Sequence, residues 1–245
     1  MIEKNVEEEN IENIVDIENL NVSYGNEKAL SNLTLKIPEG VRCAIVGPNG
    51  SGKSTLLKSI LGFKKKDSGK IKVMGNDFEK IKKRVAYVPQ KASVNWNFPV
   101  TVLDVVLMGR YAHIPLTKKA SKNDIEISIN ALKEMEMESF VDRQISELSG
   151  GQRQRVFIAR ALTQDVDIYM LDEPLTGVDI KTEEIIVKKF VELQAQGKTI
   201  ISVHHNIYTL DEYFDYLVIM NKDVKKSGYI DNINKKEYID LAFRG

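Results

Sequence analysis

The stretch CAIVGPNGSGKST, residues 43–55, joins a short apolar run to a glycine-rich turn and the start of a helix-forming segment. Its central part, GPNGSGKS at residues 47–54, matches G-x-x-x-x-G-K-[ST] at every fixed position. Glycines let successive N–H groups turn inward, toward the positive N-terminal end of the following helix, and such a cradle binds phosphate. The alternative is a glycine turn that simply starts a helix, which the complete pattern and its context disfavour. The stretch therefore predicts a phosphate-binding loop.

Two residues at the end of this loop carry groups that phosphate chemistry needs. Lys53 is predicted to reach the β- and γ-phosphates of a nucleotide. Ser54 offers a hydroxyl where a magnesium ion bridging those phosphates would sit, and magnesium needs few protein ligands because it retains waters. The cofactors that follow from the loop are ATP and Mg²⁺.

An acidic pair follows a second apolar run, IYML at residues 168–171. Asp172 and Glu173 would thus stand at the carboxyl end of a core strand, where open α/β sheets bind ligands. Because neighbouring strand residues face different ways, the two carboxylates must have different tasks. We assign Asp172 to the magnesium shell and Glu173 to polarising the attacking water. Solvated acids that merely end a strand are the alternative, which the phosphate loop makes less attractive.

The composition is that of an ordinary globular protein: 245 residues, 42% hydrophobic and 29% charged. Thirty-five basic residues balance thirty-five acidic ones, so no global field favours nucleic acid. The lone Cys43 lies in an apolar run, which favours a small buried side chain over a reactive thiol. The sequence shows neither a signal peptide nor an apolar run long enough to cross a bilayer, which predicts a cytoplasmic chain.

The order of elements predicts an α/β fold with a mainly parallel core sheet. Residues 1–13 are polar and acidic and are predicted to form a flexible tail, with one folded domain at residues 14–245. Alternating apolar residues up to Pro38 suggest an antiparallel layer, and a helical lobe is expected at about residues 91–162. Further parallel strands are expected at residues 43–46, 85–88, 168–171 and 199–203, with a crossover helix at residues 183–196.

A second signature, LSGGQ at residues 148–152, precedes the acidic pair by a short distance. A serine and two glycines at a helix start offer a hydroxyl, bare N–H groups and a positive helix end, which suits another phosphate face. In isolation an ordinary serine cap would explain it. Together with the RQRVFIARAL run at residues 153–162, however, the segment resembles the ATP-binding cassette family.

This resemblance extends from about residue 14 to about residue 233 and implies a phosphate-loop NTPase core with an antiparallel β subdomain and an α-helical subdomain. In that family two cassettes associate head to tail, so that the signature of one completes the phosphate site of the other. The resemblance implies the catalytic residues Glu173, His205 and Gln90, and the metal-shell residues Ser54, Gln90 and Asp172. The implied nucleotide-contacting residues are Tyr24, Gly47, Pro48, Asn49, Gly50, Ser51, Gly52, Lys53, Ser54, Thr55, Ser149, Gly150, Gly151, Gln152 and Asp179.

Two positions depart from the family pattern. The acidic turn that ends at Asp179 reads TGVD instead of SALD, and Asn206 follows the switch histidine where aspartate is usual. His204 and His205 are adjacent and must point in different directions, so we assign the switch role to His205. His113 is expected to be a surface histidine.

The segment SVNWNFPVTVLDVVLMGRY, residues 93–111, lies where such cassettes meet a membrane subunit. It is similar to the corresponding segment of bacterial manganese, zinc and iron importers. The resemblance implies an ATPase subunit at the cytoplasmic face of the membrane, bound to a permease through residues 96–111 and acting indirectly with a substrate-binding protein. Trp96 and Phe98 could centre that contact or instead pin the helical lobe to the core.

Other functions remain open at this point. The chain could instead serve an exporter, or an importer of another solute such as a siderophore. Only the similarity of residues 96–111 to metal importers disfavours this alternative. A soluble cassette acting on DNA or ribosomes would need a long coiled coil or two cassettes; the interval from Lys53 to Leu148 lacks sustained heptads. A phosphate-loop kinase would leave the second signature unexplained.

Overall fold

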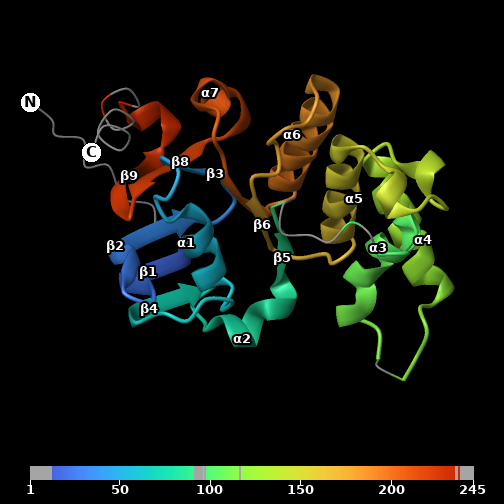
Figure 1. The fold of residues 1–245 in the computed structure, drawn as a ribbon, viewed down its shortest axis with the longest axis horizontal. Helices are drawn as coiled ribbons and strands as arrows, with labels where there is room; N and C mark the ends of the chain where they lie inside the picture. The colour runs from blue at the N-terminus through green and yellow to red at the C-terminus, as the bar shows by residue number, and fades with distance from the viewer. Residues whose placement is uncertain (1–12, 91–95, 97, 116, 235–236, 238–245) are drawn as a thin grey trace, which may run out of the picture.

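The computed structural model describes residues 13–90, 96, 98–115, 117–234 and 237. Two sheets organise this part of the chain (Figure 1). The smaller sheet is antiparallel, with the order β2-β1-β4. Its strands are β1 (Asn13–Tyr24), β2 (Glu27–Pro38) and β4 (Ser68–Val73).

The larger sheet has the order β5-β6-β7-β3-β8-β9 and is parallel except for its last strand. Its strands are β3 (Arg42–Val46), β5 (Val85–Val88), β6 (Ile168–Asp172), β7 (Thr199–Val203), β8 (Tyr216–Asn221) and β9 (Asp223–Tyr229). The predicted mainly parallel core sheet and antiparallel layer are thus confirmed. Because the five parallel strands run the same way, their carboxyl ends meet at one edge.

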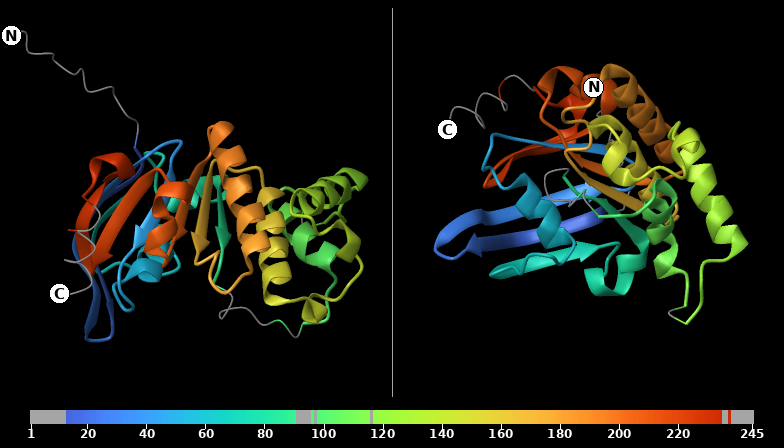
Figure 2. Two further views of the ribbon diagram at one scale, coloured as in Figure 1. Left: turned by 90° about the horizontal axis from the view of Figure 1, so that it is seen from above. Right: turned by 45° about the vertical axis from the view of Figure 1, so that its right-hand side comes forward.

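The helices cover the large sheet on both faces. They are α1 (Lys53–Ile60), α2 (Phe78–Ile81), α3 (Val102–Leu107), α4 (Lys122–Glu134), α5 (Gly150–Leu162), α6 (Ile180–Ala195) and α7 (Leu210–Tyr213). Helices α3, α4 and α5 gather beyond strand β5 and form the helical lobe (Figures 1 and 2). Short 3₁₀ turns, including Met108–Ala112 and Ile207–Thr209, complete the connections.

Alternation along β3 shows how one strand holds two layers together. Cys43 and Ile45 pack on one face, in a cluster with α1 and the small sheet. Ala44 and Val46 point to the opposite face, in a cluster with α7. On this second side α5 and α6 cover β5, β6 and β7 in a further cluster. Burial raises the pKa of the Cys43 thiol far above its usual range, so this cysteine is an inert core side chain.

The two ends of the predicted domain need one adjustment. Asn13, which the sequence assigned to the tail, pairs with Pro38 as the first residue of β1. The rest of the predicted tail and most of the expected last helix lie outside the described residues. Within the described ranges, no helix combines the length and apolarity that crossing a membrane requires.

Phe190 on α6 provides a test of the packing between α6 and the sheet. Its ring is 1% exposed in the cluster that α5 and α6 form with β5, β6 and β7. Phe190→Ala should therefore lower the free energy of unfolding by about 3–5 kcal/mol. The adjacent Val191 is 46% exposed, and Val191→Ala should change the same free energy by less than about 0.5 kcal/mol. Urea denaturation of both variants measures the difference; equal losses would contradict the packing described.

Candidate nucleotide site

The phosphate loop leaves β3 at the carboxyl edge of the large sheet, and two of its glycines are required by close backbone approaches. A Cβ on Gly47 would lie 2.1 Å from the carbonyl oxygen of Met220 on the neighbouring strand β8. Gly52 has φ +96°, and a Cβ there would lie 2.7 Å from the carbonyl oxygen of Ala29. The loop is therefore wedged between β8 and the start of β2, which fixes its path without any bound ligand.

Lys53, the first residue of α1, is held inside this loop. Its ammonium donates hydrogen bonds to the carbonyl oxygens of Gly47 and Pro48, each at 2.8 Å. Burial lowers the pKa of Lys53, while the carboxylates of Glu173 and Asp172 act in the opposite direction. The ammonium is thus already placed within the ring of backbone groups where a phosphate would bind.

Ser54 and Asp172 meet across the gap between α1 and β6. The Ser54 hydroxyl donates a hydrogen bond of 2.9 Å to Oδ1 of Asp172, which is 2% exposed. Burial raises the pKa of Asp172; the Ser54 hydrogen bond lowers it and nearby Glu173 raises it further. A hydroxyl and a carboxylate oxygen side by side are the ligand types that magnesium prefers.

Glu173 turns away from Asp172 because the backbone leaves the strand at this residue. Asp172 is the last residue of β6, whereas Glu173 adopts φ +55°, an uncommon conformation for a residue other than glycine. Its carboxylate accepts a hydrogen bond of 2.9 Å from Nε2 of Gln90 and lies 2.6 Å from Nε2 of His205. The side chains of the two acids therefore point in different directions, as predicted. The cause is the backbone turn at Glu173 and not the alternation of side chains along a strand.

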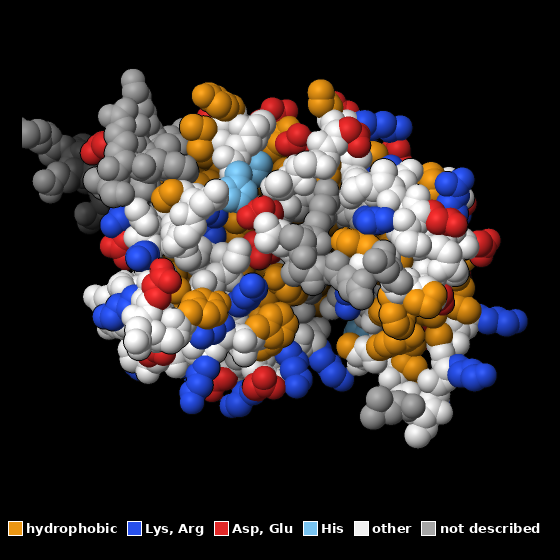
Figure 3. Space-filling model, in the orientation of Figure 1, with side chains coloured by type: hydrophobic (Ala, Val, Ile, Leu, Met, Phe, Trp, Pro, Cys, Tyr) orange, Lys and Arg blue, Asp and Glu red, His pale blue; other side chains and the backbone are white. Residues whose placement is uncertain are grey.

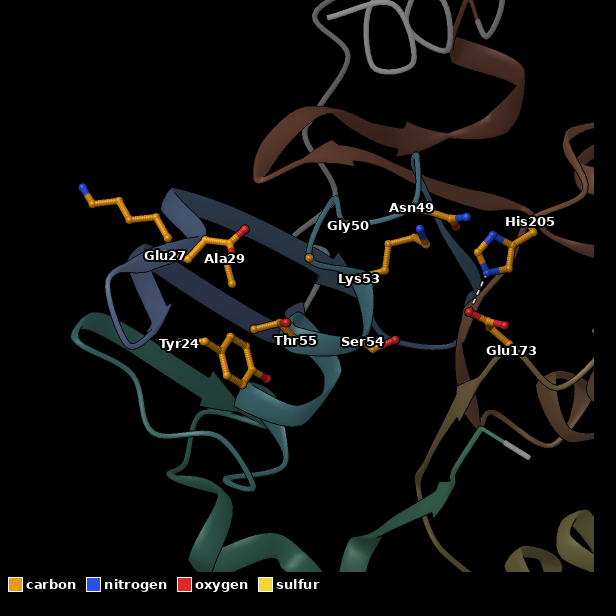
Figure 4. Close-up of a pocket in the computed structure, with 12 residues that line it drawn as sticks. Tyr24, Glu27, Ala29, Asn49, Gly50, Lys53, Ser54, Thr55, Glu173 and His205 are labelled. Atoms are coloured by element: carbon orange, nitrogen blue, oxygen red, sulfur yellow. Dashed lines mark ion pairs between the residues drawn. The ribbon is translucent and has the colours of Figure 1, made fainter. Parts of the chain in front are cut away.

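A pocket of about 330 Å³ opens in front of these groups (Figure 4). Tyr24 stands at one end and the pair of Glu173 and His205 at the other, with Lys53 between them. The pocket is lined by Tyr24, Glu27, Lys28, Ala29, Asn49, Gly50, Gly52, Lys53, Ser54, Thr55, Glu173 and His205. Among the expected residues, Gln90 and Asp172 stand just behind the lining, hydrogen-bonded to Glu173 and Ser54 respectively.

Sequence reasoning missed the start of β2 and a lysine beside Tyr24. Glu27, Lys28 and Ala29 line the pocket because the chain reverses at Gly25, φ +58°, and returns alongside β1. The Lys64 ammonium lies 3.9 Å from the centre of the Tyr24 ring. The turn after Tyr24 could have indicated the first group, whereas nothing in the local sequence indicates the second.

The residues also pass a simple test for a bound nucleotide. The hydroxyl of Ser51 is buried without a hydrogen-bond partner within the described structure, beside Gly47 at the base of the loop. Buried polar atoms are rarely left unpaired. With the inward-held Lys53 and the Ser54–Asp172 pair, the loop has the donors and the cradle that phosphates and a magnesium ion need.

Comparison with known proteins places this geometry in a family. Residues 30–176 match the family model described as "ABC transporter". The chain belongs to the ABC transporter family.

Curated relatives resemble it over nearly their full length. The chain is 46% identical to the zinc transport system ATP-binding protein TroB of Treponema pallidum, over 94% of this chain and 87% of that protein. It is 44% identical to the manganese transport system ATP-binding protein MntB of Bacillus subtilis, over 94% and 92%. Among solved structures, one described as a metal-chelate type ABC transporter in an inward-facing conformation superposes with a TM-score of 0.82. The two chains are 30% identical, and the match covers 95% of this chain and 89% of that one.

This ABC transporter protein is an ATPase cassette, and its second signature lies away from its own pocket. Ser149 caps α5: its hydroxyl accepts from the N–H of Gln152 at 3.3 Å, and Oε1 of Gln152 accepts from the N–H of Ser149 at 2.9 Å. A Cβ on Gly151 would lie 3.0 Å from Oδ2 of Asp179, so the signature abuts the acidic turn. None of these four residues lines the pocket.

Asp179 itself caps α6 in the cassette. Its carboxylate accepts hydrogen bonds of 2.9 Å from the N–H and from the hydroxyl of Thr182. The bond from the Thr182 N–H, followed by that from its hydroxyl, lowers the pKa of Asp179. The TGVD turn thus retains an ionised acid at the start of α6, next to the signature.

The predicted permease segment of this ABC transporter protein divides into two parts. Trp96 packs edge-on against Phe157 of α5 with ring centres 5.0 Å apart, and Arg153 lies over the indole at 5.2 Å. Trp96 therefore pins the segment to the helical lobe, whereas Phe98 and Tyr111 are 60% and 59% exposed. Hydrophobic side chains gather on this lobe in Figure 3. Residues 93–95 and 97 lie outside the described residues.

The close approach at Gly47 yields a testable consequence. Gly47→Ala must push the loop away from Met220, and we expect ATP affinity to fall at least about tenfold, since a new clash of this kind cannot be relieved by a flexible side chain. Gly40→Ala is the matched control, because Gly40 has φ +73° with open space around it. That variant should lose stability through backbone strain but keep its affinity. Titration with a fluorescent ATP analogue compares the two, and an unchanged affinity of Gly47→Ala would refute the wedged-loop description.

Proposed function

We propose that this cassette is the ATP-hydrolysing subunit of an importer for divalent transition-metal ions, manganese or zinc foremost and iron by resemblance. The observation that carries the hydrolytic role is the carboxylate of Glu173, which faces the pocket between Gln90 and His205. The names of TroB and MntB, and the similarity of residues 96–111 to metal importers, support the transported ion. The domain that performs this work begins at Asn13, the first residue of β1, and has its helical lobe at about residues 91–162.

The pocket residues divide the work of phosphoryl transfer. Tyr24 stacks on adenine, residues 47–55 hold the phosphates, and Lys53 neutralises charge on the β- and γ-phosphates. Ser54, Asp172 and Gln90 would hold a magnesium ion, which would neutralise phosphate charge. Glu173 accepts a proton from the attacking water, and the water oxygen bonds to the γ-phosphorus. The bond between that phosphorus and the β–γ bridging oxygen breaks, and ADP leaves. His205 bonds Glu173 and faces the γ-phosphate region.

The working unit that we propose is a head-to-tail dimer. Ser149 and Gly150 are exposed and lie outside the pocket of their own chain, so they are available to a nucleotide held by a second copy. Ser149, Gly150, Gly151 and Gln152 would meet the γ-phosphate there, with Asp179 beside them. Each chain thereby supplies half of two sites.

The membrane partner is a permease, contacted from the cytoplasmic face through residues 96–111. Phe98 and Tyr111 provide exposed aromatic surface for this contact, while Trp96 fixes the segment on α5. The transported ion need not touch the cassette, so ion choice belongs to the permease and the substrate-binding protein.

Glu173→Gln tests the hydrolytic assignment. The amide retains the shape of the side chain but cannot take up the proton, so ATP should still bind while hydrolysis falls at least about a hundredfold, as for loss of a general base. ATP should then hold two chains together. Phosphate release and mass by light scattering measure both effects, with the exposed Glu184→Gln as control. Rapid turnover by Glu173→Gln would remove this residue from the mechanism.

Metal uptake tests the transported solute. A strain that lacks the chain should accumulate less manganese, zinc or iron, and the wild-type gene should restore uptake where Glu173→Gln does not. Elemental analysis of cells grown with each metal in turn provides the measurement. Normal uptake of all three metals, with loss of sugar, amino-acid or siderophore uptake, would show that the proposed substrate is wrong while leaving the ATPase role intact.

A further inference from the structure

The segment after β7 presents His205 to Glu173. The His205 side chain is 33% exposed, and its Nε2 lies 2.6 Å from Oε1 of the Glu173 carboxylate. Histidine and acidic side chains meet near the middle of the face drawn in Figure 3. The backbone on either side must therefore fix where this imidazole stands.

His204 is buried where His205 is exposed. The backbone N–H of His204 donates a hydrogen bond of 3.0 Å to the carbonyl oxygen of Ile45, which extends the pairing of β7 with β3 by one residue. Its ring is packed 5.1 Å from the ring of Phe214 and 6.3 Å from that of Tyr213, centre to centre. Because consecutive side chains on an extended backbone diverge, burial of His204 turns His205 toward the pocket.

One hydrogen bond closes the loop that follows. Nε2 of His204 lies 2.9 Å from the hydroxyl oxygen of Thr209, the last residue of the 3₁₀ turn. The N–H of Thr209 donates to the carbonyl oxygen of Asn206 at 3.4 Å. The side chain of Asn206 accepts from the N–H of Tyr208 at 3.1 Å. The five residues after His204 are thus tied back to its imidazole.

We propose that His204 and Thr209 are positioning residues, which hold the loop between them so that His205 reaches Glu173. Ile207 and Leu210 add apolar contacts to the same layer, but these are not directional. Neither His204 nor Thr209 lines the nucleotide pocket, so both act only through His205. The inference rests on the role proposed for His205.

The imidazole of His204 is suited to a constant anchor. Burial, opposed by a hydrogen bond to the backbone of Asn206, lowers the pKa of His204 to about 4. The ring is therefore neutral at physiological pH and offers one donor and one acceptor nitrogen. Asn206, where the family commonly has aspartate, adds no negative charge to this buried ring.

Thr209→Val removes the hydroxyl with little change of shape, and Thr209→Ser retains it. The substitution removes the contact of the hydroxyl with His204 and its donation to the carbonyl oxygen of Asn206, and we expect Thr209→Val to lower kcat for ATP hydrolysis about five- to tenfold, with KM for ATP unchanged. Thr209→Ser should remain within about twofold of wild type. His204→Phe keeps an aromatic ring at this position but removes the hydrogen bonds to Thr209 and to the backbone of Asn206, so its loss of kcat should be at least that of Thr209→Val; it provides a second variant if one fails to fold.

A double-mutant cycle with His205→Ala separates positioning from general structural damage. In the His205→Ala background, Thr209→Val should have no further effect on single-turnover hydrolysis, because the residue that it positions is absent. Activities are normalised to the fraction of chains that bind ATP. Equal losses in both backgrounds, or full activity of both Thr209→Val and His204→Phe, would overturn the anchor while leaving the role of His205 standing. Full activity of His205→Ala would overturn that role and the anchor with it.

Discussion

Parallel pairing of β3 with β7, and of β7 with β6, is the constraint on which the nucleotide site depends. Val46, Asp172 and Val203 are the last residues of these three strands, so the segments that follow them emerge at one edge of the sheet. The phosphate loop, the acidic pair and the two histidines come from distant parts of the sequence. They meet because backbone hydrogen bonds fix the register of their strands, and a slip of one residue would turn Asp172 and His204 away from the sides on which they are buried.

Two pairs of neighbours are separated by different physical means. Asp172 completes β6 and bonds Ser54, while Glu173 enters a left-handed conformation and bonds Gln90. His204 continues the extended strand into the core, so that His205 faces outward by alternation. The strained backbone at Glu173 is held by partners on both of its carboxylate oxygens, one from Gln90 and one from His205. The geometry of the proposed catalytic site is thus built from ordinary strand ends together with one residue, Glu173, at positive φ.

The sequence predicted the elements because their signals are local. The apolar run at residues 43–46, the glycines after it and the helix-forming residues after those could be read in order, and the structure agrees. The strand order β5-β6-β7-β3-β8-β9 could not be obtained in this way, since it depends on packing between distant segments. The same limit explains Lys64 over Tyr24 and Trp96 against Phe157, contacts between elements that no spacing within either element encodes. The TGVD turn and Asn206 depart from the family pattern. In the structure, the Asp179 side chain at the end of that turn caps α6, and the Asn206 side chain caps the 3₁₀ turn that follows it.

The signature lies outside the pocket of its own chain. The Ser149 hydroxyl caps α5, and Gly151 has no room for a side chain because Asp179 lies against it. These contacts fix the positive end of α5 in a defined place, outside the lining of the pocket of the same chain. The start of α5 combines two exposed residues, Ser149 and Gly150, with Gly151 held against Asp179, and its positive end suits a negatively charged ligand. In the proposed head-to-tail dimer this ligand is the nucleotide of a second copy, so each pocket is completed by the signature of the partner and hydrolysis needs both chains.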